Sequence, residues 1–170
     1  MISPHVILEF WFGPGYLTGP VAYREEWFRK SDAFDQAIGA RFGDTVAAVL
    51  TAPDAALGEV LQAPAPAGLT PAHRRLALIL VADQFTRNLF RGHPRAFAGD
   101  PLALALAREG VRQADDQTLP PMLRHFMYMP FEHSETLADQ DESVRLFTAL
   151  NSSGDFASPL DYAHRHREVI

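Results

Sequence analysis

Five polar side chains recur along one segment in the middle of the chain at the spacing of a single helix face. At about 100° per residue they span an arc of roughly 140°, and they are Asp83, Gln84, Arg87, Asn88 and Arg91. Asp83 precedes Arg87 by four residues, the favourable order for a helical ion pair. The two guanidinium groups carry more donors than that pair satisfies. The pattern therefore predicts either an interhelical polar network or a binding site for an anion.

A second group of chemically capable side chains lies in the sequence Met-Pro-Phe-Glu-His-Ser-Glu at 129–135, predicted as a loop between two helices. An imidazole beside carboxylates suits general-base catalysis, with His133 as the base and Glu132 or Glu135 orienting it. In that interpretation Arg87 and Asn88 stabilise developing negative charge. Alternatively, Ser134 caps the next helix and Glu135 favours its positive N-terminal end, which involves no catalysis.

Several reaction classes are excluded by what the chain lacks. It contains no cysteine, which excludes disulfides, thiolate metal sites and a nucleophilic thiol. The serine-hydrolase elbow Gly-x-Ser-x-Gly, the phosphate-binding glycine motifs and His-Glu-x-x-His are all absent. His164 and His166 are two residues apart, so a helix points them to nearly opposite sides. We therefore predict no metal and no cofactor.

The net charge of the chain limits the classes of partner that it is expected to bind. A formal net charge of -6 disfavours binding to nucleic acid or to an anionic membrane surface. No apolar run reaches the roughly 18 residues of a membrane span, and no basic leader precedes the first apolar stretch. The prediction is a cytoplasmic protein whose partner is a small polar or anionic molecule or a peptide. The sequence leaves homo-oligomerisation open.

Cap residues and prolines indicate where the helices begin, and no segment shows the β-branched runs of hairpin strands. The segment 62–70 contains two prolines and a glycine and is predicted to be a connection. Pro130 is predicted to end the helix before it. Predicted helix starts are Ser3-Pro4, Ser31 or Asp32, Thr70-Pro71, Asp100-Pro101, Pro120-Pro121, Ser134 or Asp141, and Ser158-Pro159.

These elements predict one all-α domain over residues 1–170. The helix from Thr70 carries the polar face and is predicted to close near Gly92. The last helix reaches Ile170 with no glycine, asparagine or proline to end it. We therefore expect the native polypeptide to continue for a short C-terminal segment.

Several motifs, taken in order, resemble the bacterial domain of unknown function 924 family. They include Phe10-Trp11-Phe12-Gly13, the run from Asp83 to Asn88, Arg91-Gly92 and the run from Glu132 to Glu135. The resemblance covers nearly the whole chain. It implies a tetratricopeptide-like array of antiparallel helices, followed by a further segment rich in phenylalanine, arginine and asparagine. It implies no activity.

The leading functional hypothesis is a cleft between the helix bearing Asp83–Asn88 and the loop bearing Glu132–Glu135. This cleft is predicted to bind a small polar or anionic ligand or a peptide carboxylate, with Arg87 as a bidentate fork oriented by Asp83. The alternatives are a hydrolase that uses His133 as general base, and a scaffold that binds proteins through its helical surface.

Overall fold

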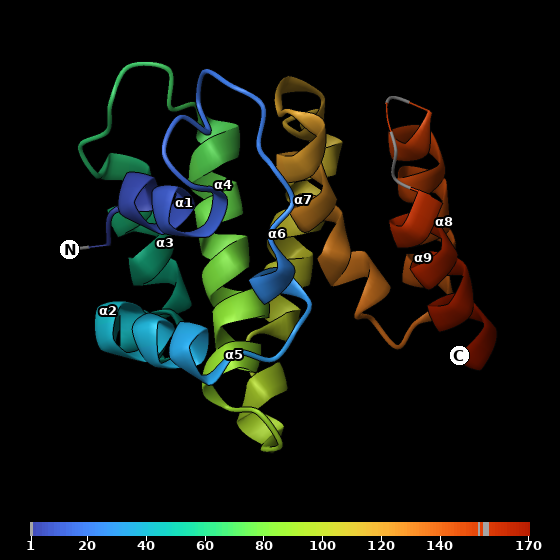
Figure 1. Ribbon diagram of the computed structural model, residues 1–170, viewed down its shortest axis with the longest axis horizontal. Coiled ribbons are helices and arrows are strands. Elements are labelled where there is room, and N and C mark those ends of the chain that lie inside the picture. The colour runs from blue at the N-terminus through green and yellow to red at the C-terminus, as the bar shows by residue number, and fades with distance from the viewer. Residues whose placement is uncertain (1, 153, 155–156) are drawn as a thin grey trace.

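The computed structural model describes residues 2–152, 154 and 157–170, and this part of the chain is helical without a strand (Figure 1). The elements are α1 (Pro4–Phe12), η1 (Glu25–Trp27), α2 (Asp32–Thr51), α3 (Pro53–Gln62), α4 (Pro71–Ile79), η2 (Leu80–Phe85), α5 (Thr86–Leu89), η3 (Pro94–Phe97), α6 (Asp100–Arg112), η4 (Asp116–Thr118), α7 (Pro121–Glu132), α8 (Leu137–Asn151) and α9 (Ala157–Val169). The predicted all-α class is confirmed. No helix among the described residues is both long and apolar enough to cross a membrane.

Side-chain caps start three of the helices at the predicted places. The hydroxyl of Ser3 accepts from the backbone N–H of Val6, and the hydroxyl of Ser31 accepts from that of Phe34. Thr70 forms a reciprocal capping box with His73 at the start of α4. These local bonds satisfy backbone donors that the first helical turn leaves unpaired, which is why the sequence alone located them.

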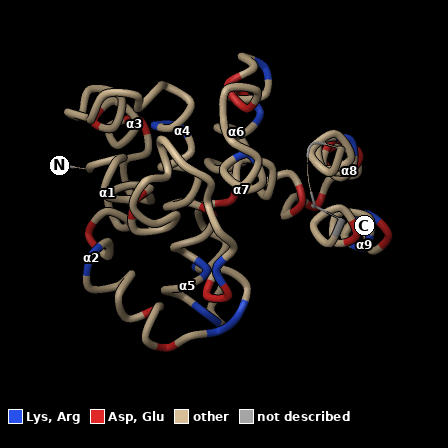
Figure 2. The backbone as a smooth tube through the Cα atoms, turned by 45° about the horizontal axis from the view of Figure 1, so that its top comes forward, with Lys and Arg blue, Asp and Glu red and all other residues tan. Residues whose placement is uncertain are grey.

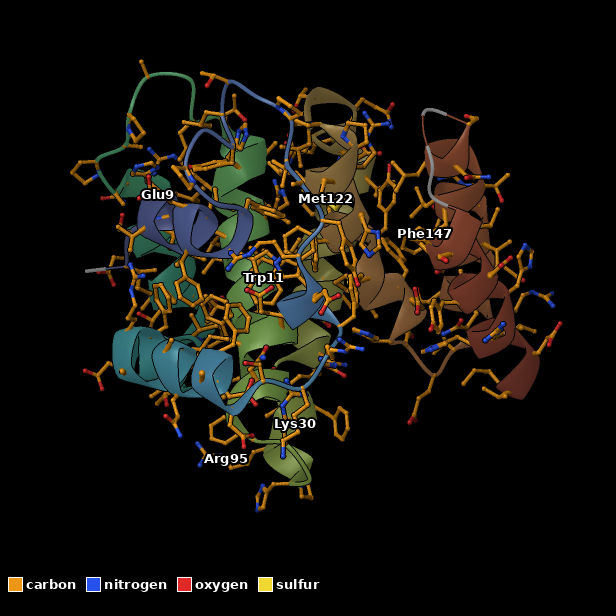
Figure 3. All side chains as sticks on the ribbon, in the orientation of Figure 1. Glu9, Trp11, Lys30, Arg95, Met122 and Phe147 are labelled. Atoms are coloured by element: carbon orange, nitrogen blue, oxygen red, sulfur yellow. The ribbon has the colours of Figure 1, made fainter. Side chains whose placement is uncertain are left out.

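The segment α4–η2–α5 forms a continuous rod through the middle of the molecule, with α1–α3 on one side and α6 and α7 on the other (Figure 1). Every residue from Leu76 to Thr86 is buried. The rings of Phe85 and Phe126 pack against Trp11 with centroids 5.6 and 5.5 Å away, and Trp11 lies at the centre of Figure 3. The prediction that the rod runs through the interior is confirmed.

The rod is not a uniform α-helix. Leu80–Phe85 is π-helical, with one more residue per turn than the flanking α-helical segments. Short π-helical insertions within α-helices often mark functional sites. The Thr86 hydroxyl donates to the carbonyl of Ala82 at 2.8 Å, which satisfies one acceptor there. The sequence pattern, treated at a constant helical period, did not predict this insertion.

One helix was not predicted, and two predictions about the helices were wrong. α3 was not predicted, because it follows α2 after a single residue. α7 does not end at Pro130 but continues to Glu132, and the buried side chains of Met129, Pro130 and Phe131 offset the hydrogen bond that proline cannot donate. Thr136, rather than Ser134 or a residue near Asp141, caps α8.

α8 and α9 pack on each other and on α7, at the end of the molecule farthest from α2 and α3 (Figure 1). The link 133–136 joins α7 to α8. Acidic and basic positions lie close together around α5 (Figure 2), which places several charged side chains next to the rod.

Candidate functional site

Asp83 lies at the centre of a polar cluster on the π-helical segment, and it is only 1% exposed. One carboxylate oxygen, Oδ1, lies 2.7 Å from Nδ1 of His133 and 3.1 Å from Nη1 of Arg87. The other, Oδ2, accepts from Nε2 of Gln84 at 2.5 Å. The fold therefore brings Asp83, Gln84, Arg87 and His133 together, although His133 is 50 residues away in the sequence.

The charge state of Asp83 follows from these neighbours. Burial raises the pKa of Asp83, but His133, Arg87 and Gln84 outweigh that effect and hold the pKa below its usual value. Asp83 is therefore ionised at neutral pH. An ionised carboxylate only accepts hydrogen bonds, so the proton between Asp83 and His133 belongs to the imidazole Nδ1.

Arg87 is held between two carboxylates. Its Nη1 and Nη2 donate to the two oxygens of Asp100 at 2.8 and 3.0 Å, and Nη1 also donates to the Asp83 carbonyl at 2.6 Å. The guanidinium carbon lies 5.4 Å from the centroid of the Phe97 ring. The fork predicted to bind an anionic ligand is thus already occupied by Asp100, a partner that the sequence analysis did not identify.

Asn88 and Arg91 belong to a separate cluster, in which both bind Asp35 of α2. Nδ2 of Asn88 donates to Oδ1 of Asp35 at 2.7 Å, and Nε of Arg91 donates to Oδ2 at 2.6 Å. The five side chains do lie along one side of the rod, as predicted. They cover more of its circumference than a single neighbouring helix can contact. One edge meets α6 and α7, and the other meets α2. Asn88 and Arg91 therefore do not lie in the same cluster as His133, contrary to the prediction.

An open cavity of about 680 Å³ lies beside this cluster. Among the predicted site residues, Arg87, His133 and Glu135 line it. The complete lining is Arg87, Phe97, Asp100, Pro101, Leu104, Pro130, His133, Ser134, Glu135 and His166. The two faces of the cavity thus come from the end of the rod with α6 and from the end of α7 with α9.

Ser134 is occupied by a structural role. Its hydroxyl donates to Oδ2 of Asp139 at 2.6 Å, and the Thr136 hydroxyl donates to the same oxygen at 2.5 Å. Arg108 binds Asp139 from α6 through both carboxylate oxygens. This cluster fixes the start of α8, and it explains Ser134 without assigning it a nucleophilic role.

Glu132 is not among the described residues that line His133's cavity, but it lines a second one. Its Oε1 lies 3.5 Å from Nε2 of His166, and its backbone carbonyl accepts from Gln140 at 2.8 Å. The predicted orienting carboxylates for His133 were Glu132 and Glu135, but the group bonded to its Nδ1 is Asp83. The described residues place no three His, Asp or Glu side chains together in a way that could hold a metal ion.

Replacing Glu132 with glutamine is expected to stabilise the protein at pH 7. Burial raises the pKa of Glu132, and His133 and His166 only partly offset this. A raised folded-state pKa means that the stability contribution is present at low pH and is lost as pH rises from the unfolded-state value of 4.5 through the folded one. We expect a gain of about 0.5–2 kcal/mol in urea unfolding at pH 7, shrinking below pH 4.5. A loss of stability at pH 7 would contradict this prediction.

Comparisons with known proteins identify a family for this chain and indicate no activity. No curated protein matches the chain. The protein of unknown function ATU0120 from Agrobacterium tumefaciens has a solved structure that is similar, with a TM-score of 0.77 and 34% sequence identity over 98% of this chain and 81% of that chain. Residues 7–170 match the family described as "Bacterial protein of unknown function (DUF924)". The chain therefore belongs to this bacterial family, DUF924, as its motifs indicated.

Proposed function

We propose that the cavity beside His133 is the functional site and that it binds a small polar ligand. The observation that carries this proposal is the contact of His133 Nδ1 with the nearly inaccessible carboxylate of Asp83, at 2.7 Å. A buried carboxylate on one nitrogen of an imidazole fixes both the orientation of the ring and its tautomer. His133 itself lines the cavity.

The chemistry of the ligand follows from that tautomer. In the neutral form of the ring, the proton on Nδ1 leaves Nε2 unprotonated, and Nε2 then accepts hydrogen bonds. No residue in the described part of the chain bonds to this Nε2. The group of the ligand that meets His133 is therefore a hydrogen-bond donor, such as a hydroxyl, an amide N–H or an ammonium.

The charges around the cavity favour a neutral or cationic ligand over an anion. Asp83 and Asp100 together already outweigh the single charge of Arg87. Glu135 adds a further carboxylate to the wall. Among the described lining residues, an anion entering here meets more carboxylates than guanidinium groups, and the one guanidinium, that of Arg87, is already paired. Of the ligand classes predicted from the sequence, the small polar molecule is thus better supported than the anion or the peptide carboxylate.

Catalysis by His133 is the second candidate function, and the same contact favours it. A proton-accepting imidazole held by a buried aspartate is the arrangement in which histidine acts as general base. Because the Ser134 hydroxyl is committed to Asp139, the group that His133 deprotonates in this hypothesis is a water or a substrate hydroxyl. Four expectations from the sequence analysis remain predictions. They are the tetratricopeptide-like array, the scaffold role, the cytoplasmic setting and the cofactor-free site.

Nitrogen NMR of the histidine side chains tests the proposal. We expect the neutral His133 ring to carry its proton on Nδ1 rather than on Nε2, because ionised Asp83 needs a donor. Adding acetamide or ethanolamine is expected to shift the His133 Nε2 signal, whereas acetate is expected to leave it in place. In Asp83→Asn the amide no longer demands a donor, so the protonated nitrogen should change.

His5 provides the matched control in the same spectra, because its Nδ1 contacts the Tyr16 hydroxyl at 3.0 Å and no carboxylate. Asp83→Asn should leave the His5 signals unchanged. A neutral His133 ring with its proton on Nε2 in the wild-type protein, or a response to acetate alone, would contradict the proposed site.

A further inference from the structure

A second cavity, of about 620 Å³, lies between α7, α9 and the residues flanking η1. Its volume is in the range of sites that hold drug-sized ligands, roughly 300–1,000 Å³. Among the described residues it shares no lining side chain with the cavity of His133. Its wall includes Met122 and Met129 from α7, and Met122 is labelled in Figure 3.

Three aromatic rings on this wall are unusually exposed. The exposed fractions of Tyr23, Phe28 and Tyr162 are 60%, 51% and 55%. Tyr23 and Phe28 are stacked, with ring centroids 6.0 Å apart. Exposed aromatic side chains gathered around one hollow are a feature of binding sites, unlike hydrophobic residues scattered singly over a surface. Their ring faces carry negative potential and attract organic cations.

The ring of Tyr162 already interacts with a cation in this structure. The guanidinium carbon of Arg165 lies 5.6 Å from its centroid. Methionine sulfur and aromatic rings together form an adaptable apolar surface. The wall is thus suited to a ligand that combines an apolar body with a positive charge.

One carboxyl group in this wall has little to compensate its charge. Glu132 is 8% exposed, and its carboxylate makes no hydrogen bond to any described residue, only the 3.5 Å contact with His166. Buried carboxylates normally accept hydrogen bonds, because an uncompensated buried charge is costly. An ammonium group in the cavity would supply both the charge and the donors.

Among the described residues that line this cavity, Glu132 is the only one with a carboxylate, and none is a lysine or an arginine. His125 also lines the cavity, and burial lowers its pKa to about 4, so it is neutral at pH 7. The groups acting on Glu132 from the other side of α7 are His133 and Asp83, and from α9 His166. The carboxylate of Asp83 adds negative charge on that side, and the two imidazoles act against it.

We propose that this second cavity binds an organic amine whose ammonium group pairs with Glu132 and whose apolar body packs on Tyr23, Phe28 and Tyr162. The site is independent of the function proposed for His133. A neutral ligand of the same shape would gain the aromatic contacts but leave Glu132 uncompensated, and an anion would be repelled by it.

The first experiment compares three probes of one shape on the full chain at pH 7. They are phenethylammonium, 2-phenylethanol and 3-phenylpropanoate, each titrated into ¹⁵N-labelled protein and followed by amide chemical shifts. We expect phenethylammonium to bind with a dissociation constant in the millimolar range, as its size allows, and about tenfold more tightly than the alcohol. Equal binding of the alcohol, tighter binding of the anion, or no saturable shift with the amine would overturn the proposal.

Variants then assign the binding to its residues. Glu132→Gln is expected to weaken phenethylammonium binding about tenfold and to leave 2-phenylethanol unchanged, because only the amine uses the charge. Glu168→Gln removes a charge from the exposed part of α9, outside the cavity lining, and should change neither affinity. Unchanged amine binding in Glu132→Gln would overturn the proposal.

A second pair of variants keeps the test valid if the substitution at Glu132 disturbs the fold. Phe28→Leu and Tyr162→Leu replace exposed rings with apolar side chains that lack the π face. Each is expected to weaken amine binding about two- to fivefold while leaving alcohol binding within twofold. Equal loss for the amine and the alcohol would show hydrophobic packing alone and would contradict the cation site.

Discussion

Asp83→Ala is expected to lower the free energy of unfolding by about 3–5 kcal/mol at pH 7. The carboxylate is 1% exposed and serves His133, Arg87 and Gln84 at once. Removing it leaves the imidazole N–H without an acceptor, and an amide and part of a guanidinium without theirs, around a position that is itself nearly inaccessible to solvent. Urea unfolding of the two proteins measures the difference directly.

The pH dependence of that difference separates lost charge from lost packing. Because the folded-state pKa of Asp83 lies below the unfolded-state value of 3.8, its stabilisation is present above pH 3.8 and is lost as pH falls through the folded value. The gap between wild type and Asp83→Ala should therefore narrow in acid. A gap that stays constant with pH would indicate packing as the whole effect.

Asp100→Ala is the matched control, since it removes the other carboxylate that binds Arg87. Asp100 is more exposed, with 27% of its side chain accessible, and Arg87 keeps its contacts with Asp83. We expect a loss of only about 1 kcal/mol. If Asp83→Ala cost no more than Asp100→Ala, or raised stability, the cluster would not be a structural network, and Asp83 would be a residue retained at the expense of folding.

The sequence was informative where a structural feature depends on neighbours in the chain. Ser3, Ser31 and Thr70 each cap a helix through a bond to a residue three positions later, so the signal is complete within four residues. The buried rod was predictable for a similar reason, because its own residues place apolar side chains on nearly every side of the helix. Local chemistry of this kind does not depend on the tertiary structure.

Competing local signals were harder to resolve. Ser134 and Thr136 are both N-cap residues by type, and only the structure shows that Thr136 caps α8 while Ser134 bonds to Asp139. Pro130 is a helix breaker in isolation, yet the burial of its neighbours keeps α7 helical past it. In both cases tertiary packing selects between alternatives that are close in local free energy.

Part of the candidate cluster could be predicted from the sequence, but its pairings could not. Asp83, Arg87, Asn88 and His133 were expected to line one cleft. The structure brings Asp83, Arg87 and His133 into contact and pairs Asn88 with Asp35 instead. Asp35 and Asp100 were missed as partners, because ion pairs across 56 and 13 residues leave no periodic signal. The width of the polar arc concealed that its two edges face different helices.

Gly99→Ala is expected to destabilise the protein by about 3 kcal/mol or more, at the upper end of the cost of overpacking. A Cβ atom at Gly99 would lie 2.1 Å from the carbonyl oxygen of Ala82 and 2.8 Å from its carbonyl carbon. Both are backbone atoms of the π-helical segment, so no side chain can rotate away. Relief requires α6 to move from the rod, which also separates Asp100 from Arg87 across the cavity of His133.

Gly43→Ala provides the contrast, because a Cβ atom there meets nothing within 4 Å and the residue lies inside α2. That substitution should stabilise the protein by about 0.5–1 kcal/mol through helix propensity. Thermal and urea unfolding of both variants test the pair, and amide shifts around Asp100 report whether the cavity opens. If Gly99→Ala were as stable as wild type, the close approach of α6 to the π-helical segment would not be required by the fold, and the cavity would need another explanation for its shape.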